Sequence, residues 1–456
     1  MITLIAITGL GVLCLLFEIF NWRKVIIPFS ILGLIGVLGL IVSEFNTVHG
    51  YYNNMIVVDR FAMAFSGLFT LLTIFLIALS HDFYANHPTK LSDFIAIKIF
   101  LLAGAVAMVA FGNLSMFFLG IEILSISLYV LAASDRLNLK SNEAGMKYFL
   151  MGSFASGFIL FGICLIYGAT GSFDVAEIYA LSQSELIPQW FFIGLGMIII
   201  GMLFKIAAVP FHFWAPDVYE GSPALTTATM STLAKIVAMA ALFKLASGLN
   251  ADHSPIAEIV IAVVSVLSMT VGNFMALRQD NVKRMLAFSG ISHAGFMLMA
   301  LFSLSSAGIL LYYTAAYALA GIAAFAVILY VCKNKGNEAI ANFNGLGKTH
   351  PILAAILTGA LLSMGGIPIF SGFFGKFMLF TQTINSGYLA VVIFAVVNSI
   401  VSIGYYFKII LAMYTKESDA EKTAKVPFAF YAVGAVAILL NLAIGIFPSL
   451  VVDLLG

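Results

Sequence analysis

The stretch LFKIAAVPFHFWAPDVYEGSPALTTATMSTLAK, from Leu203 to Lys235, decides how the rest of the chain is interpreted. It places Lys205 at the end of an apolar run and interrupts that run at Pro210. A polar, aromatic segment follows, and a new apolar run then begins and carries Lys235. If these runs cross a membrane, both lysines need a functional explanation, because a charge at that depth is costly.

The composition indicates a membrane protein. Hydrophobic residues make up 62% of the 456 positions, charged residues only 9%, and the mean hydropathy is +1.07. Globular domains contain roughly 25% charged residues. The net charge of +1, with no basic tail, argues against a nucleic-acid partner. The expected surroundings are therefore lipid.

Fourteen apolar runs are each long enough to cross a hydrocarbon layer of about 30 Å. They predict an all-α polytopic membrane protein of about fourteen transmembrane helices, forming one membrane domain over 1–456. The loops 169–189 and 333–350 are too short to be soluble domains. The runs are 2–20, 25–43, 56–80, 94–112, 114–133, 148–168, 190–209, 223–247, 256–277, 286–304, 307–331, 351–382, 388–414 and 429–453.

The distribution of basic residues predicts the orientation. Cytoplasmic loops of membrane proteins carry an excess of Lys and Arg. Even-numbered loops hold only Arg60, so we expect the odd-numbered loops to be cytoplasmic, both termini to lie outside, and the chain to reside in the inner (plasma) membrane of a bacterium. The first run lacks a basic leader and a cleavage site, and we expect it to be retained. The odd-numbered loops hold fifteen bases: Arg23, Lys24, Lys90, Arg136, Lys140, Lys147, Arg278, Lys283, Arg284, Lys333, Lys335, Lys348, Lys416, Lys422 and Lys425.

Six further lysines lie within the predicted spans. Lys98 and Lys244 are near helix ends, and we expect them to extend to the membrane interface. Lys408 is compatible with either a structural or a functional role. The remaining three, Lys205, Lys235 and Lys376, lie deeper in their spans, as does the acidic residue Glu122.

The deep charges have a structural explanation and a functional one. The structural explanation is a static buried ion pair, such as Glu122 with Lys205, but three lysines exceed the one obvious acid. The functional explanation is proton transfer, because a lysine in an apolar interior can exchange its proton near neutral pH. His293 would suit a relay between lysines, although a lone histidine is more often a packed core residue. His212, beside Pro210, is similarly ambiguous.

Proline interrupts two spans in comparable contexts, AAVPFHFW around Pro210 and GGIPIFSG around Pro368. Transporters use such broken helices at inverted repeats. Glu122 lies two spans before the first break, and His293 lies two spans before the second. The sequence therefore predicts two five-helix inverted repeats, spans 4–8 (94–247) and 9–13 (256–414), with peripheral N-terminal helices (1–80) and a C-terminal helix (429–453).

No cofactor or metal site is predicted within this chain. Cys14, Cys164 and Cys332 are isolated in separate runs, whereas an iron–sulfur cluster requires four ligands. The segment GLGKT (345–349) lacks the first glycine of a phosphate loop, because position 342 is Asn. The histidines outside the spans show no metal-ligand spacing.

Several stretches resemble the antiporter-like membrane subunits of respiratory complex I, and the resemblance covers essentially the whole chain. PDVYEGSP followed by TTATMSTLAK resembles the N-type members. GFFGKF (372–377) has lysine where the M-type has glutamate, and the long C-terminal lateral helix of the L-type is missing. The stretches are KIAAVPFHFWAPDVYEGSP (205–223), TTATMSTLAK (226–235), FFLGIEILSISLYVLAA (117–133) and NEAGMKYFLMGSFASG (142–157).

The resemblance implies a role for each buried ionisable group. Glu122 would modulate Lys205, the lysine of the broken seventh helix. Lys235 would be the eighth-helix relay and Lys376 the terminal lysine of the broken twelfth helix. His293 occupies a tenth-helix site where related chains carry a polar relay residue. In addition, Lys147 corresponds to a sixth-helix lysine near the cytoplasmic side, a possible uptake point.

The resemblance also implies partners and cofactors outside this chain. NAD, FMN, iron–sulfur clusters and quinone would be bound by other subunits, and the neighbours would be M-type and small K/J-type membrane subunits. The expected function is coupled proton translocation within an NADH:quinone oxidoreductase. A subunit of a multisubunit Na⁺/H⁺ antiporter is the alternative, and a purely structural scaffold would leave the four deep charges unexplained.

Overall fold

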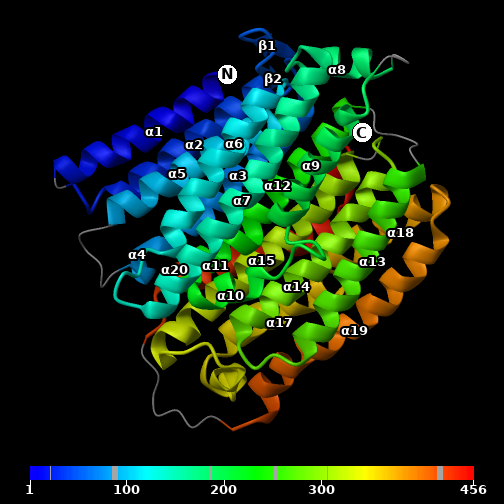
Figure 1. Ribbon diagram of the computed structural model, residues 1–456. Coiled ribbons are helices and arrows are strands. Elements are labelled where there is room, and N and C mark those ends of the chain that lie inside the picture. The colour runs from blue at the N-terminus through cyan, green and yellow to red at the C-terminus, as the bar shows by residue number, and fades with distance from the viewer. Residues whose placement is uncertain are drawn as a thin grey trace.

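The computed structural model describes residues 1–20, 22–84, 91–183, 187–249, 255–305, 307–417 and 425–455. Lys90 and Lys422, which entered the charge pattern above, lie outside these ranges. The described residues form a bundle of roughly parallel helices, with α1 on one flank and α19 on the opposite one (Figure 1). One small antiparallel hairpin, β1 (His49–Tyr51) with β2 (Ile56–Val58), joins α2 to α3.

The helices of the first part of the chain follow the predicted apolar runs. They are α1 (Ile2–Ile19), α2 (Ile26–Glu44), α3 (Arg60–Ala78), α4 (Ser80–Phe83), α5 (Leu91–Val109), α6 (Leu114–Ala132), α7 (Leu139–Thr170), α8 (Val175–Ser182), α9 (Trp190–Lys205), α10 (Trp214–Gly221), α11 (Ala224–Thr229), the π-helix η1 (Met230–Ala234) and α12 (Lys235–Gly248).

The second part continues the same arrangement. Its helices are α13 (Pro255–Leu277), α14 (Val282–Leu298), η2 (Met299–Phe302), α15 (Ala307–Lys335), η3 (Ile340–Phe343), α16 (Leu346–Thr349), α17 (Pro351–Gly365), α18 (Ser371–Asn385), α19 (Leu389–Thr415), α20 (Phe428–Ile446) and α21 (Ser449–Val452). η2 and η3 are 3-10 helices.

Twelve helical segments among the described residues are long and apolar enough to cross a membrane. Two shorter apolar helices, Trp190–Lys205 and Pro351–Gly365, lie where proline was predicted to interrupt spans seven and twelve. The membrane-spanning, all-helical fold class is thus confirmed, whereas the count of fourteen and the inverted repeats stay predictions. The residue-range division of the domain also stays a prediction. Within it, α3 packs against the central helix α15.

The odd-numbered and the even-numbered predicted loops lie at opposite faces of the bundle. A cavity at one face is lined by residues from the predicted loops three, five, seven, nine and eleven, including Tyr84, Asp135, Ser222, Lys283 and Glu338. A cavity at the other face is lined by residues in or beside the even-numbered predicted loops, including Asn54, Gly112, Asp174, Gly248 and Leu304. This separation is the one expected if successive apolar runs cross the membrane in alternating directions.

The bundle centre consists of three helices. The apolar part of α15 is completely buried inside the protein, and the apolar parts of the α11–η1–α12 segment and of α14 are almost completely buried. α12 packs against α9, α14 and α15. A helix enclosed by protein on every side can carry polar groups that lipid would not tolerate.

Candidate functional site

The first break leaves Lys205 at the last position of α9. The chain turns through a cis Val209–Pro210 bond, with Ala207 in the left-handed region at φ 58°, and resumes as α10. The indole of Trp214 donates to the carbonyl of Phe204 at 3.0 Å, and Val209 N donates to Ser268 Oγ at 2.9 Å. The backbone groups freed by the break are therefore partly satisfied by side chains, as a buried helix end requires.

Lys205 is held by hydroxyl groups. Its ammonium donates to Ser125 Oγ at 2.8 Å, to Ser156 Oγ at 3.2 Å and to Tyr129 OH at 3.5 Å. Glu122 lies one turn before Ser125 on α6 and interacts electrostatically with Lys205, but no ion pair joins them, and the buried oxygen Oε1 of Glu122 has no hydrogen-bond partner in the described structure. The static ion pair considered above is thus not formed.

Lys235 lies at the start of α12, directly after the π-helical turn η1. Its side chain is only 2% exposed, and its ammonium has no hydrogen-bond partner among the described residues. π-helical turns inside α-helices are frequent at functional sites. Close by, Ser231 Oγ and Tyr317 OH lie 3.3 Å apart.

His293 lies between two tyrosines. Its Nδ1 is 2.8 Å from Tyr313 OH, and its Nε2 is 3.2 Å from Tyr406 OH. The Tyr406 hydroxyl is also 2.5 Å from Ser289 Oγ. His293 lines one small cavity with Lys376, and the Lys235 ammonium lies against Gly290, one turn before His293 on α14, so the imidazole is close to both lysines rather than on an isolated apolar face.

The second break provides partners for Lys376. α17 ends at Gly365, and Gly366 adopts φ 84° before α18 begins. The Lys376 ammonium donates to the carbonyls of Met364 at 3.1 Å and Gly365 at 3.2 Å and to Ser399 Oγ at 2.9 Å. These carbonyls are at the C-terminal end of a helix, where the partial charge is negative and favours a cation.

His293 and Lys376 share a small cavity. It measures about 10 Å³ and is also lined by Tyr313, Tyr317 and Ser363. A space of this size approaches the volume that one water molecule needs, and its lining offers polar partners. The described geometry therefore brings together Lys235, His293 and Lys376 around the tyrosines of α15, with Lys205 on the adjoining helix α9.

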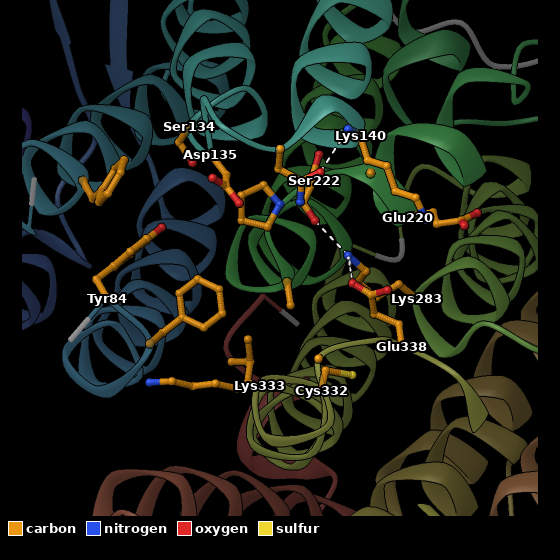
Figure 2. Close-up of a pocket in the computed structure, with 18 residues that line it drawn as sticks. Tyr84, Ser134, Asp135, Lys140, Glu220, Ser222, Lys283, Cys332, Lys333 and Glu338 are labelled. Carbon is orange, nitrogen blue, oxygen red and sulfur yellow. Dashed lines mark hydrogen bonds and ion pairs between the residues drawn. The ribbon is translucent and has the colours of Figure 1, made fainter. Parts of the chain in front are cut away.

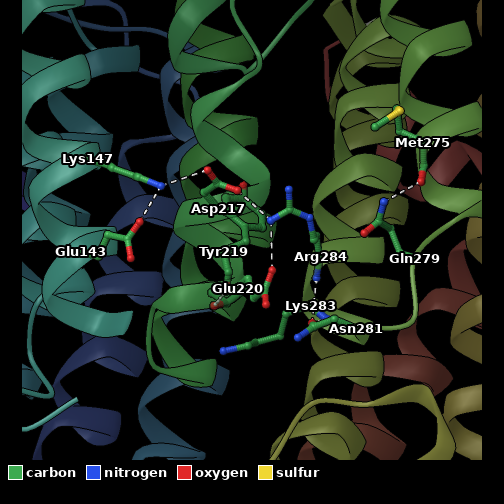
Figure 3. Close-up of polar contacts among 11 residues, drawn as sticks. Glu143, Lys147, Asp217, Tyr219, Glu220, Met275, Gln279, Asn281, Lys283 and Arg284 are labelled. Atoms are coloured by element: carbon green, nitrogen blue, oxygen red, sulfur yellow. Dashed lines mark hydrogen bonds and ion pairs between the residues drawn. The ribbon is translucent and has the colours of Figure 1, made fainter. Parts of the chain in front are cut away.

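Lys147 belongs to a network of charges at one face of the bundle. It pairs with Glu143 at 2.7 Å and with Asp217 at 3.2 Å, and Arg284 pairs with Asp217 at 2.7 Å and with Glu220 at 3.0 Å (Figure 3). The network joins α7, α10 and α14. Lys147 is thus not among the deep groups, and it lies on the face that carries the odd-numbered loops.

A cavity of about 320 Å³ opens at the same face (Figure 2). Lys283 lies at its edge, almost entirely buried, and pairs with Glu338 at 2.9 Å while donating to the carbonyl of Ser222 at 2.9 Å. Ser222 lies two residues before the α11–η1–α12 segment that carries Lys235. The cavity therefore adjoins the helix on which the central lysine lies.

The other three lysines within the predicted spans, Lys98, Lys244 and Lys408, each bind a polar partner outside the group of deep residues. Lys98 was expected to extend to the interface, and this is wrong: its side chain is 2% exposed, donates to Ser80 Oγ at 2.6 Å and lies 5.2 Å from the ring centre of Tyr84. Lys244 pairs with Asp59 at 2.9 Å near the opposite face. Lys408 reaches Asp280 at 2.8 Å in a loop, and this hydrogen bond lowers the pKa of the Asp280 carboxyl.

Sequence reasoning did not identify the tyrosine partners of His293. Tyr313 of α15 is 20 residues from His293 in the chain, and Tyr406 of α19 is 113 residues from it. The available signal was the tyrosines inside the apolar runs LLYYTAAYA and GYYFK, because a buried phenol requires a partner. His212 is buried beside the first break, and its Nδ1 has no hydrogen-bond partner in the described structure.

Comparison with known proteins agrees with this architecture. The family model described as NADH:quinone oxidoreductase/Mrp antiporter, TM matches residues 111–402. The NADH-quinone oxidoreductase subunit N of Flavobacterium johnsoniae is 72% identical, with all of both chains covered. A chain of respiratory complex I from Thermus thermophilus, solved with bound aureothin, superposes with a TM-score of 0.86 at 30% identity, covering 100% of this chain and 99% of that one.

A chain of an archaeal membrane-bound sulfane sulfur reductase also superposes, with a TM-score of 0.87 at 25% identity over 99% of this chain and 96% of that one. The fold is therefore that of a multi-pass, antiporter-like membrane subunit. The chain belongs to the NADH:quinone oxidoreductase/Mrp antiporter membrane family and, within it, groups with the subunits N.

Proposed function

We propose that this protein is a proton-translocating membrane subunit of an NADH:quinone oxidoreductase, residing in a bacterial inner membrane with both termini outside. Redox chemistry, with NAD, FMN, iron–sulfur clusters and quinone, takes place in partner subunits. Its neighbours in the membrane are an M-type subunit and small K/J-type subunits, together with lipid. The high identity to subunits N along the full chain supports this assignment.

The observation that carries the proposal is the set of deep ionisable groups. Lys235, His293 and Lys376 are each at most 4% exposed, and none of them forms an ion pair within the described structure. A buried charge that no opposite charge neutralises is expensive. A protein that maintains three such groups beside one another, linked by hydroxyls, is suited to moving a proton among them.

The transfer begins at Glu122 and Lys205. Lys205 donates to neutral hydroxyls of Ser125 and Ser156, and the Glu122 carboxyl lies one turn before Ser125 on α6. When quinone reduction elsewhere changes the charge at this end, Glu122 and Lys205 separate and Lys205 holds its proton less tightly. The proton then passes to Lys235 on the adjoining helix.

The second half of the route receives the proton from Lys235. His293 accepts it through one ring nitrogen and, with tyrosine hydroxyls at both nitrogens, passes it toward Lys376. Lys376 releases it to the outside. Uptake occurs from the face of the odd-numbered loops, which we assign to the cytoplasm. Lys147 (Figure 3) and the cavity beside Lys283 (Figure 2) are at this face.

Lys205→Ala tests the proposal in the purified, reconstituted complex. We expect NADH-driven quinone reduction to continue at a reduced rate, whereas proton translocation through this subunit is lost. The matched control is Lys408→Ala, which removes a loop-facing lysine and should leave coupling unchanged. An unaltered ratio of protons to electrons in Lys205→Ala, or transport driven by an imposed sodium gradient without NADH, would contradict the proposal.

A further inference from the structure

Gly290 of α14 faces the Lys235 ammonium. A Cβ atom at position 290 would lie 2.6 Å from Lys235 Nζ and 3.2 Å from Tyr317 OH. Neither neighbour is backbone, and both are the ends of side chains from other helices. The missing side chain at this position is thus what allows the ammonium to lie directly against α14.

Other glycines of the same region have a different environment. A Cβ at Gly295, also on α14, would meet the Ser265 carbonyl oxygen at 2.7 Å and Met269 N at 2.9 Å. A Cβ at Gly272 would meet Ser292 N at 2.7 Å. Those two glycines allow α13 and α14 to approach closely, which is a packing role. Gly290 is unlike them, because what it accommodates is a charged group.

Gly290 lies one turn before His293 on α14, so the contact between Gly290 and Lys235 also fixes where the ammonium lies relative to the imidazole. Residues three apart on a helix lie on the same face. The Lys235 ammonium, which is buried and without a hydrogen-bond partner in the described structure, is therefore held one turn from His293. Tyr317 flanks both groups, since its ring centre is 4.7 Å from that of His293 and its hydroxyl adjoins Gly290.

We propose that Gly290 is a positioning residue for proton transfer between Lys235 and His293. By presenting no side chain, it keeps the Lys235 ammonium against α14 on the face that carries the imidazole. A methyl group at this position would displace the end of the lysine side chain away from that face. The proposal rests on the relay role given above to Lys235.

Gly290→Ala is a sharp test because only flexible side-chain ends must move to admit the methyl group. We expect the complex to assemble in normal amount and to keep its melting temperature. Proton translocation per quinone reduced should fall to the level of Lys235→Met, which removes the ammonium and retains most of the side-chain volume. The double variant Gly290→Ala/Lys235→Met should translocate no less than Lys235→Met alone, because both changes act through the same group.

Two further glycines provide controls. Gly196 on α9 has nothing within 4 Å of its Cβ position, so Gly196→Ala should behave as the unmodified protein. Gly295→Ala should reduce assembly, because the added methyl group would meet backbone.

The outcomes separate this inference from the proposed function. If Lys235→Met abolishes coupled translocation and Gly290→Ala does not, Gly290 has no positioning role and the relay stands. If Gly290→Ala lowers assembly or melting temperature even in the Lys235→Met background, its role is packing. If Lys235→Met translocates normally, the relay itself is wrong, and the positioning role fails with it.

Discussion

At the scale of single residues, the three deep lysines differ in how they are held. Lys205 donates to three hydroxyls, Lys376 donates to two helix-end carbonyls and a serine, and Lys235 has no hydrogen-bond partner in the described structure. Hydrogen bonds to a charged group stabilise it by roughly 1.5–3 kcal/mol. The central lysine is therefore the one whose charge the protein stabilises least, which suits a group that passes its proton on in either direction.

His293 gives a prediction at this scale. Tyr406→Phe removes a hydroxyl that contacts both His293 Nε2 and Ser289, and a lost buried hydrogen bond costs about 1–3 kcal/mol. We expect coupled proton translocation to slow by roughly tenfold if that cost falls on the transfer step. Measurements of proton uptake into proteoliposomes during NADH oxidation would show it.

Tyr312→Phe is the matched control for this measurement. Tyr312 lies beside Tyr313 on α15, but its hydroxyl donates to the carbonyl of Ile444 on α20, away from the imidazole. Translocation should remain normal in this variant. Equal slowing in both variants would mean that the effect of Tyr406→Phe is one of general packing.

At the scale of elements, the two breaks provide polar groups in different ways. At the first break, side chains from elsewhere satisfy the freed backbone, and the lysine belongs to the ending helix. At the second, the freed carbonyls of α17 bind the lysine of the following helix α18. Each break also holds one non-glycine residue in the left-handed region, Ala207 at φ 58° and Ile369 at φ 88°, and such strain typically costs ~1–3 kcal/mol.

Gly366 gives the prediction at this scale. Gly366→Ala adds a methyl group 3.2 Å from Lys376 Nζ and forces an L side chain into φ 84°, which costs roughly 1–2 kcal/mol. We expect a lower melting temperature and a loss of coupled translocation, because Lys376 is displaced from the helix-end carbonyls.

Gly387→Ala separates the two effects. Gly387 has a similar φ of 90°, but nothing lies within 4 Å of its Cβ position. This variant should bear a comparable backbone cost and still translocate protons. If it lost translocation to the same extent as Gly366→Ala, strain alone would explain both results.

At the scale of the whole molecule, the charged network at one face joins the two predicted halves. Asp217 on α10 binds Lys147 of α7 and Arg284 of α14 (Figure 3). α14 also carries Gly290 and His293. A movement of the segment after the first break would therefore be transmitted to the helix that faces Lys235. This connection lies on the face that we assign to the cytoplasm.

The predicted membrane orientation, with the odd-numbered loops in the cytoplasm, can be tested by labelling one exposed position at each face. Leu137 is 98% exposed on the face of the odd-numbered loops, and Tyr52 is 69% exposed in the hairpin at the other face. We expect a membrane-impermeant maleimide applied to intact cells or spheroplasts to label Tyr52→Cys and not Leu137→Cys, with the unmodified protein as background. The reverse pattern would overturn the predicted orientation.

Much of the fold could be predicted from the sequence because hydropathy acts locally. Each apolar run is long enough to span by itself, and both breaks were expected where proline removes a backbone donor. Position within the apolar run indicated that Lys235 and Lys376 are buried, whereas Glu122 and Lys205 are only partly buried. The same criterion was wrong for Lys98, because Ser80 and Tyr84 from a neighbouring segment enclose it near its helix start.

The sequence by itself thus determined that this chain lies in a membrane, where its helices break, and which of its apolar runs carry ionisable groups. Only the tertiary structure decided what each of those groups contacts. Ser125 is 80 residues from Lys205, and Tyr406 is 113 residues from His293. The free energy of placing a residue in lipid depends chiefly on that residue and its neighbours in the chain, whereas a hydrogen bond depends on which distant helices pack together.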